Sequence, residues 1–352
     1  MQLRDLRTAL ATTKHAVAAS KTDLTTLGNI WFTGRGAAAY DGELLVVTPF
    51  DGLSSGVGVS HDLLSKWTSA VNPSAEVEVE EDGPSVSFYT PSSSLSIAAF
   101  PPSLDLDVPT PPEDAVLLDG PDEASRFVSV CAEWMLTALG GDETLVQDCF
   151  GLWFLCEDEQ VRVMSTNNQV IATASFNCPF KFHDFAVAPR FLSVVCALAK
   201  GSPLVNIYRV EGAVVAVLED GTEITAPMLV NTDSDVAWDL VSRVVGAENQ
   251  DLVSNVQLHD ALVTAYRLAK DSPIRMVVNG GTAQVSVEGS ETVKFNTRVP
   301  SNAGRDGTAG EALLFPKYLA DFAKITGVNM GIQGSMVSMS WAGCYAAVAT
   351  LG

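Results

Sequence analysis

The segment Val187-Ala188-Pro189-Arg190-Phe191-Leu192 has two counterparts in the chain, Val59-Ser60-His61-Asp62-Leu63-Leu64 and Leu314-Phe315-Pro316-Lys317-Tyr318-Leu319. Each begins with an apolar residue that closes a strand-like run, and each leads into a segment with helical periodicity. The three copies begin 128 and 127 residues apart. A regular spacing of this kind indicates an internal repeat.

A second marker repeats at about the same distance. Apolar, strand-like runs occupy residues 29–32, 151–154 and 274–278. After each helix-opening segment, two alternating strands surround a glycine, which is Gly83, Gly212 or Gly334. Every unit therefore contains strands, a helix and a hairpin with one buried face.

Each unit also contains an earlier helix, in which apolar residues such as Leu3, Leu6 and Leu10 follow helical spacing. The six expected helices cover residues 2–21, 60–71, 123–140, 188–201, 257–271 and 315–327. Residues 101–121 and 246–251 have the composition of linkers. The pattern predicts an α+β chain of three tandem domains, 1–117, 118–247 and 248–352, each with two helices packed on antiparallel sheets.

Composition excludes several classes of protein. The mean hydropathy of +0.20 comes from scattered apolar residues, and no run approaches the roughly 18 to 20 residues that span a bilayer. The opening residues do not have the order of a signal peptide, so we expect a cytoplasmic protein without membrane association. The six cysteines include no C-x-x-C pair and the four histidines lie far apart, so we expect no metal site, cofactor or disulfide framework.

The net charge of −21 argues against nucleic acid until the distribution of charge is considered. The six expected helices contain twelve basic and seven acidic residues, whereas the rest of the chain contains nine and 35. The basic residues of these helices are Arg4, Arg7, Lys14, Lys21, Lys66, Arg126, Arg190, Lys200, Arg267, Lys270, Lys317 and Lys324. An acidic chain has thus concentrated its cations on one class of element, although a solvated helix face is the commoner explanation of a single basic stripe.

Three tandem units of this composition resemble the bacterial DNA sliding clamp, the beta subunit of the replicative DNA polymerase. The likeness spans the chain and is strongest at 151–154, 161–168 and 187–190, which run in the order of the family. The first short strand of the family has no counterpart in the sequence. The resemblance implies a head-to-tail homodimer of six domains, a ring that encircles double-stranded DNA independently of its sequence.

The resemblance also assigns roles to residues. The twelve helix cations are candidate DNA-facing residues, and Lys21 matches a basic residue that contacts DNA in the family. Peptides of the DNA polymerase and the clamp loader bind the family in an apolar groove between the second and third domains. The matching positions are Thr166, Asn168, Gln169, Val170, Pro227, Tyr318 and Val348.

This groove departs from the family pattern. The family's T-D-G-H-R-L becomes T-N-N-Q-V-I at 166–171, and its M-P-M-R-L end becomes A-V-A-T-L-G at 347–352. The preferred partner peptide therefore stays open. Such divergence fits a clamp that serves its own polymerase, for instance one encoded by a bacteriophage.

Other interpretations are weighed against a clamp. The turn Gly34-Arg35-Gly36 lacks the helix that a phosphate-binding loop requires, and no catalytic motif is visible, so we expect no enzyme. The principal alternative is a non-enzymatic viral or assembly protein with repeated β-rich domains and no role with DNA. A further alternative is a clamp-like decoy that binds the polymerase peptides of a host.

Overall fold

The computed structural model describes residues 1–18, 27–53, 56–101, 115–139, 151–167, 169–230, 232–245, 252–253, 255–268, 270, 272–279, 282–288, 295–300, 310–325, 327–333 and 335–351. They form two compact units. Unit 1 comprises residues 1–128 and 190–228, and unit 2 comprises 129–189 and 229–352. The division passes through the predicted middle domain, because strands of that domain complete a sheet in each unit.

Unit 1 contains a seven-stranded antiparallel sheet in the order β12-β13-β14-β3-β2-β1-β4. Its strands are β1 (Asn29–Thr33), β2 (Gly36–Tyr40), β3 (Leu45–Thr48), β4 (Val57–Ser60), β12 (Leu204–Val210), β13 (Ala213–Leu218) and β14 (Glu223–Pro227). β14 pairs with β3, with Ile224 opposite Val46. The hydroxyls of Thr48 and Thr222 add a buried hydrogen bond of 2.9 Å at this junction. The sheet therefore continues across the predicted boundary at residue 117.

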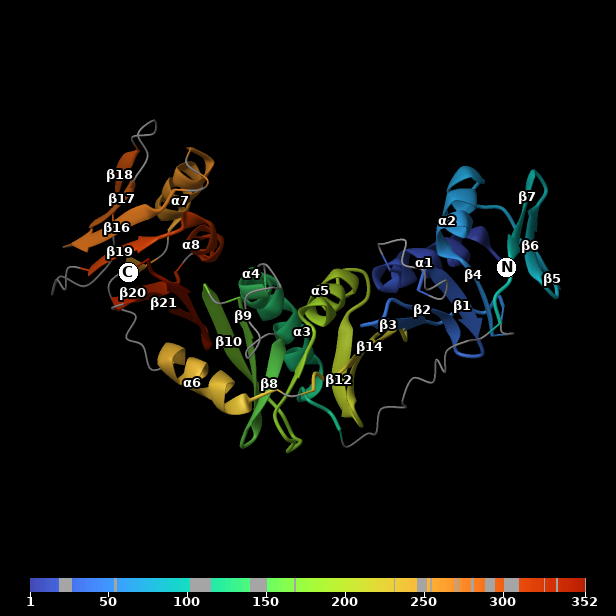
Figure 1. The fold of residues 1–352 in the computed structure, drawn as a ribbon, viewed down its shortest axis with the longest axis horizontal. Helices are drawn as coiled ribbons and strands as arrows, with labels where there is room; N and C mark the ends of the chain where they lie inside the picture. The colour runs from blue at the N-terminus through green and yellow to red at the C-terminus, as the bar shows by residue number, and fades with distance from the viewer. Residues whose placement is uncertain are drawn as a thin grey trace. The chain divides into compact units, whose positions relative to one another are not determined.

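The helices of unit 1 are α1 (Leu3–Thr13), continued by a 3₁₀ turn (Lys14–Ala16), α2 (His61–Ala70), α3 (Gly120–Val130), which extends into unit 2, and α5 (Pro189–Leu198). α1 and α2 lie side by side (Figure 1). Leu3, Leu6 and Leu10 of α1 share a buried core with Leu64 and Trp67 of α2. Burial of such side chains stabilises the fold by roughly 1.5 to 3 kcal/mol each. A small sheet of β5 (Glu78–Asp82), β6 (Ser85–Thr90) and β7 (Ser93–Ala98) completes the unit.

Unit 2 contains an eight-stranded antiparallel sheet in the order β11-β8-β9-β10-β22-β21-β20-β15. Its strands are β8 (Leu152–Glu157), β9 (Gln160–Thr166), β10 (Val170–Asn177), β11 (Phe185–Val187), β15 (Leu252–Val253), β20 (Asn329–Gln333), β21 (Met336–Trp341) and β22 (Cys344–Ala349). A four-stranded sheet has the order β18-β17-β16-β19, formed by β16 (Ile274–Asn279), β17 (Thr282–Val287), β18 (Asn296–Pro300) and β19 (Gly310–Leu314). The pairing of β10 with β22 crosses the predicted boundary at residue 247.

The helical segments of unit 2 are a π-helical turn (Cys131–Met135), α4 (Leu136–Leu139), α6 (Ser234–Val245), α7 (Val256–Leu268) and α8 (Pro316–Ala323). The ring of Trp134 packs 5.3 Å from that of Phe322 and joins the π-helical turn to α8. The hydroxyl of Ser165 donates a 3.0 Å hydrogen bond to the carbonyl of Met135. A π-helical turn interrupts the regular hydrogen bonds of an α-helix. The Ser165 hydroxyl gives the buried Met135 carbonyl a hydrogen-bond donor there.

The predicted markers and hairpins are confirmed. The runs at 29–32, 151–154 and 274–278 lie in β1, β8 and β16, and the three predicted hairpins are the pairs β5–β6, β12–β13 and β20–β21. Near the start of the chain, Gln2 forms an isolated antiparallel bridge with Glu76. Pro189 and Pro316 each occupy the first turn of a helix, where proline costs no hydrogen bond.

Three expectations about helices were wrong. α1 ends at Thr13, whose hydroxyl donates to the carbonyl of Ala9, whereas the periodicity predicted a helix to residue 21. A threonine that bonds its own helix competes with the regular pattern there. Pro121, expected in a linker, lies in the first turn of α3. The segment from Ser234 to Val245, for which no helix was expected, forms α6.

Candidate nucleic-acid and partner-peptide interfaces

α1 separates its apolar and basic residues as its spacing predicts. Leu3, Leu6 and Leu10 are buried, whereas Arg4 and, in the 3₁₀ turn that follows α1, Lys14 are exposed. Arg4 has only a solvated contact of 3.3 Å with its neighbour Asp5. These two cations are therefore accessible to an anion in solution.

Arg7 is held by the protein itself. Its Nε and Nη2 atoms donate hydrogen bonds of 3.0 and 2.7 Å to the carbonyls of Thr68 and Val71 at the end of α2. Carbonyls at the end of a helix lack partners within the helix and attract cations. Arg7 thus attaches α1 to the C-terminal end of α2, which leaves fewer of its donors for an external ligand.

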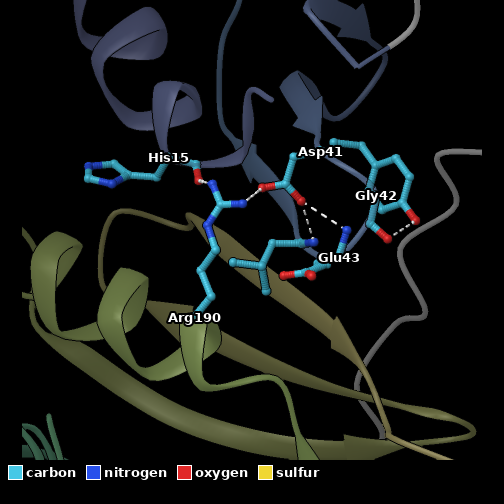
Figure 2. Close-up of polar contacts among 7 residues, drawn as sticks. His15, Asp41, Gly42, Glu43 and Arg190 are labelled. Atoms are coloured by element: carbon cyan, nitrogen blue, oxygen red, sulfur yellow. Dashed lines mark hydrogen bonds and ion pairs between the residues drawn. The ribbon is translucent and has the colours of Figure 1, made fainter. Parts of the chain in front are cut away.

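Arg190, at the start of α5, also contacts protein groups (Figure 2). Its guanidinium forms an ion pair with Asp41 and donates a 2.7 Å hydrogen bond to the carbonyl of His15. The Asp41 side chain is only 1% exposed, and its Oδ1 also accepts from the amides of Glu43 and Leu44. Arg190 therefore joins α5 to the β2–β3 turn and to the end of the α1 segment.

The remaining basic candidates differ in their surroundings. Lys66, Arg126 and Lys324 form ion pairs of 2.7, 3.2 and 3.2 Å with acidic residues of their own helices. In the described part of the chain, no ion pair involves Lys14, Lys200, Arg267, Lys270 or Lys317, and all five are exposed. Lys21 lies outside the described residues. These five lysine and arginine side chains offer the least compensated positive charge among the predicted DNA-facing residues.

The structure brings three of the predicted groove residues onto adjacent strands. Val170 of β10 lies directly opposite Val348 of β22, and the hydroxyl of Thr166, at the end of β9, donates to the carbonyl of Val170 over 2.9 Å. Gln169 is exposed and its carbonyl accepts from the amide of Ala349. These residues therefore meet where the second and third predicted domains share a sheet.

Side-chain alternation separates this set between two faces of the sheet. Directly opposed residues point to the same face, so Val170 and Val348 share one face, while Thr166 and Ile171 share the other. Val170 and Val348 are 1% and 2% exposed, so the protein already covers both side chains. Ile171 is only partly buried and belongs to a cluster on the opposite face.

That cluster was missed by reasoning from sequence. It unites Trp153, Ile171 and Met164 of the sheet with Ala237 and Val241 of α6. α6 lies against the sheet on the side opposite α4 (Figure 1). The indole of Trp238 donates to Asp184 over 2.8 Å, and Asp184 also accepts from the amide of Cys156. The apolar spacing of 237, 241 and 244 was the available signal for this helix.

The other predicted groove residues lie as follows. Pro227 is an exposed residue at the end of β14 in unit 1, and Tyr318 is a half-buried residue of α8 in unit 2. The amino group of Lys317 lies 5.2 Å from the centre of the Tyr318 ring. Asn168 lies outside the described residues.

Several titratable groups have pKa values displaced by burial. Burial lowers the pKa of His61, and Lys14 adds to that effect, whereas a hydrogen bond with Leu10 opposes it. Burial also raises the pKa of Glu223, although the neighbouring Arg35 opposes this. Burial raises the pKa of the Cys196 thiol to about 11, a value that keeps it protonated and unreactive.

No group of three or more His, Cys, Asp or Glu side chains suited to a metal ion occurs within the described ranges.

Within those same ranges, the helices are too short or too polar to traverse a bilayer.

Comparison with known proteins shows which of them share this architecture. No family model matches the sequence, and no curated protein matches it either. Solved structures do match over the whole chain. A DNA polymerase sliding clamp from Pseudomonas aeruginosa has 14% identity and a TM-score of 0.81, with 100% of this chain and 98% of that chain covered.

Two further structures match equally well. The pol III beta of Caulobacter crescentus has 15% identity and a TM-score of 0.81, covering 100% and 99% of the two chains. The beta subunit of DNA polymerase III from Thermotoga maritima has 14% identity and a TM-score of 0.80, covering 100% and 98%. This chain has the fold of a bacterial DNA sliding clamp. The predicted α+β class, with helices on antiparallel sheets, is confirmed.

Proposed function

We propose that the chain is a sliding clamp, a processivity factor that encircles double-stranded DNA and tethers a replicative DNA polymerase. Its three domains would be residues 1–117, 118–247 and 248–352. The observation that carries this proposal is the full-length sliding-clamp fold combined with helix-borne cations in a chain of net charge −21. Nothing in this role requires catalysis or a cofactor.

A clamp has to hold DNA without reading its bases. Weak attraction of phosphates by scattered cations satisfies that requirement, because backbone contacts carry no sequence information. Exposed Lys14, Lys200, Arg267, Lys270 and Lys317 suit this purpose. An acidic surface elsewhere would repel DNA and leave the basic helices as the favourable place for it.

A head-to-tail dimer would need complementary edges on the first and third domains. Among the described strands, β7 pairs only with β6, and β18 only with β17. The opposite edge of the small sheet, β5, carries Glu78, Glu80, Glu81 and Asp82, and charged side chains discourage edge pairing. We therefore assign ring closure to β7 of one protomer and β18 of its partner.

Peptides of a polymerase and a clamp loader would bind where β10 joins β22. The face of that junction that carries Thr166 and Ile171 also carries α6, and Ile171, Trp238 and Leu240 are only partly buried there. Partly exposed apolar and aromatic residues are the usual anchors of an interface. Gln169, Pro227 and Tyr318 would be additional contacts.

The test combines solution mass with retention on DNA. Light scattering should give about twice 37.3 kDa for the dimer. After loading, the protein should stay on circular duplex DNA and leave the same DNA once it is cut. A monomer that treats circular and linear DNA alike would contradict the proposal and favour the assembly protein without a role with DNA.

A clamp-like decoy would share the fold of a working clamp and would differ from it in its effect on the polymerase. Both would bind a polymerase peptide, but only a working clamp would increase the length of DNA that its polymerase copies in one binding event. The cytoplasm of a bacterial cell or of a phage-infected host is the compartment where we expect it to act.

A further inference from the structure

α6 contacts strands β8, β10 and β22, so it crosses one face of the eight-stranded sheet (Figure 1). Its small side chains Ala237 and Val241 pack there against Trp153 and Met164. Contacts between apolar groups have no preferred direction, and an isolated helix of 12 residues is only marginally stable. Apolar packing alone therefore leaves the rotation of α6 about its own axis weakly determined.

One hydrogen bond supplies the missing direction. The indole of Trp238 donates to Oδ2 of Asp184 over 2.8 Å. Among the residues that the structure describes, no other side-chain hydrogen bond or ion pair joins α6 to the sheet or its connecting loops. The ion pair of Arg243 with Asp239, for example, lies within the helix. The bond to Asp184 therefore fixes which side of α6 faces the sheet near β8.

Asp184 is itself held in place on β8. β11 begins at Phe185, opposite Phe154, so the amide of Cys156 lies beyond the end of β11. Oδ1 of Asp184 accepts from that amide over 2.7 Å and replaces the missing strand. The ring of Phe185 stacks on Phe154 at 4.9 Å and packs 5.6 Å from Phe182. A carboxylate that is fixed on both sides and accepts two N–H groups gives the helix a firm point of attachment.

The far end of α6 lies near the junction of β10 with β22. Val241 and Val245 follow Trp238 by three and seven positions, so the three side chains lie along one side of the helix. Val245 is about 10 Å from Trp238 along the helix axis, at about 1.5 Å per residue. Val245 and Ile171 are both partly buried and pack against the same apolar cluster. A change of rotation at Trp238 would therefore change the position of Val245 relative to Ile171.

We propose that Asp184 is a positioning residue for the peptide site. Through Trp238 it sets the rotation of α6, and thereby the spacing of Val245 and Ile171 at the junction of β10 with β22. The proposal rests on the proposed function, which assigns a partner peptide to this face, and it does not require Asp184 to touch that peptide. The partly buried residues Ile171, Leu240 and Val245 carry no charge, so the site suits an apolar peptide segment.

The test measures peptide affinity with the full chain. The probe is a fluorescein-labelled peptide selected from a random library on the wild type, and it is kept only if Ile171→Glu, verified as folded, abolishes its binding. Fluorescence anisotropy gives the Kd. Asp184→Ala and Trp238→Phe should each weaken binding about tenfold, and the double variant should lose no more than either single variant, because both changes remove the same bond. The matched control is Asp239→Asn, which alters a carboxylate that bonds only within α6 and should leave the Kd unchanged.

Stability and affinity should respond differently to the two variants. Asp184→Ala also loses the bond to the Cys156 amide, so it should lower the free energy of unfolding more than Trp238→Phe does, whereas affinity should fall equally. A role confined to stability predicts wild-type affinity in every folded variant. Wild-type affinity in folded Asp184→Ala, or additive losses of affinity in the double variant, would overturn the proposal.

Hydrogen exchange gives a spectroscopic check by nuclear magnetic resonance. The indole N–H signal of Trp238 is assigned by its absence in Trp238→Phe. In Asp184→Ala this indole should exchange faster than in the wild type, while the backbone amides of α6 stay protected, as expected for a helix that remains folded but has lost its directional bond. Loss of protection along the whole of α6 would show that Asp184 keeps the helix folded and does not merely position it, which would overturn the proposal.

Retention on circular DNA separates this proposal from the proposed function. A protein that stays on circles while Asp184→Ala binds the peptide like the wild type would be a clamp without this positioning residue. A protein that treats circular and linear DNA alike, but whose peptide affinity depends on Asp184 only when Trp238 is present, would have the positioning residue without being a clamp. If no selected peptide depends on Ile171, the peptide site and this proposal both fail, and retention on circles still tests the clamp.

Discussion

The guanidinium of Arg190 is paired with the carboxylate of Asp41, a side chain only 1% exposed although it belongs to a surface turn (Figure 2). The same guanidinium donates to the carbonyl of His15. Three segments that are distant in sequence are thereby joined through one side chain. Arg190 was expected on a DNA-facing surface. Its guanidinium already contacts Asp41 and His15, so any contact with DNA would have to share the guanidinium with these two residues.

Loss of Arg190 should destabilise unit 1. Arg190→Ala leaves the buried Asp41 carboxylate without its cation, and we expect a loss of about 1 to 3 kcal/mol in the free energy of unfolding, moderated by the exposure of the arginine. Urea unfolding measures it. The double variant with Asp41→Asn should recover part of the loss, because the amide oxygen still accepts from Glu43 and Leu44. Purely additive effects would contradict the coupling of the two residues.

Val170 should behave as a core residue. Val170→Ala removes two methyl groups from a side chain that is 1% exposed, which should lower the free energy of unfolding by about 2 kcal/mol. Gln169→Ala, at the neighbouring exposed position, is the control and should change stability little. If both variants had wild-type stability but only Val170→Ala lost affinity for a polymerase peptide, Val170 would belong to the peptide groove instead.

The anchor of α6 can be tested at Trp238. Trp238→Phe keeps an aromatic ring but removes the hydrogen bond to Asp184, so we expect a loss of about 1 to 2 kcal/mol in chemical unfolding. Asp184→Asn should lower the free energy of unfolding by a similar amount. Asp184 accepts from both the Trp238 indole and the Cys156 amide, and the single side-chain oxygen of asparagine cannot replace both of its oxygens. Wild-type stability in both variants would show that this hydrogen bond does not hold α6 on the sheet.

His61 should make stability depend on pH. Burial holds the pKa of His61 below its ordinary value of 6.5, so the unfolded chain takes up a proton more readily than the folded chain. The stability that depends on neutral His61 is therefore complete above pH 6.5 and declines as pH falls below it. His61→Gln keeps a donor for the Leu10 carbonyl but does not titrate, so its stability should decline less between pH 7.5 and 5.5. Equal declines, measured by urea unfolding at each pH, would exclude His61 as the cause.

The strands show most clearly which parts of the fold could be predicted from the sequence. Local periodicity was sufficient for the hairpins around Gly83 and Gly212, because alternation and a turn residue are properties of neighbouring residues. It failed at residues 234–245, where no helix was expected and the structure has α6. Helix formation there draws on a surface presented by Trp153 and Ile171, which are far from α6 in sequence.

The groove residues show the same limit. Resemblance located Val170 and Val348 at the junction of two domains, and the structure pairs them directly. Which face each side chain occupies depends on strand register, and a shift of one residue reverses it. Only the folded sheet therefore distinguishes the buried Val170 from the partly exposed Ile171.

By itself the sequence determined the repeat, the α+β class, and the concentration of cations on helices, since each of these is carried by the spacing and composition of nearby residues. The tertiary structure alone decided which cations are free. Arg7 and Arg190 look like Lys14 in the sequence, but the first donates to the end of α2 and the second binds Asp41, whereas Lys14 lines an open hollow. The reason is physical: a charge is compensated by the groups that lie near it in space, and those groups come from elements that folding brings together.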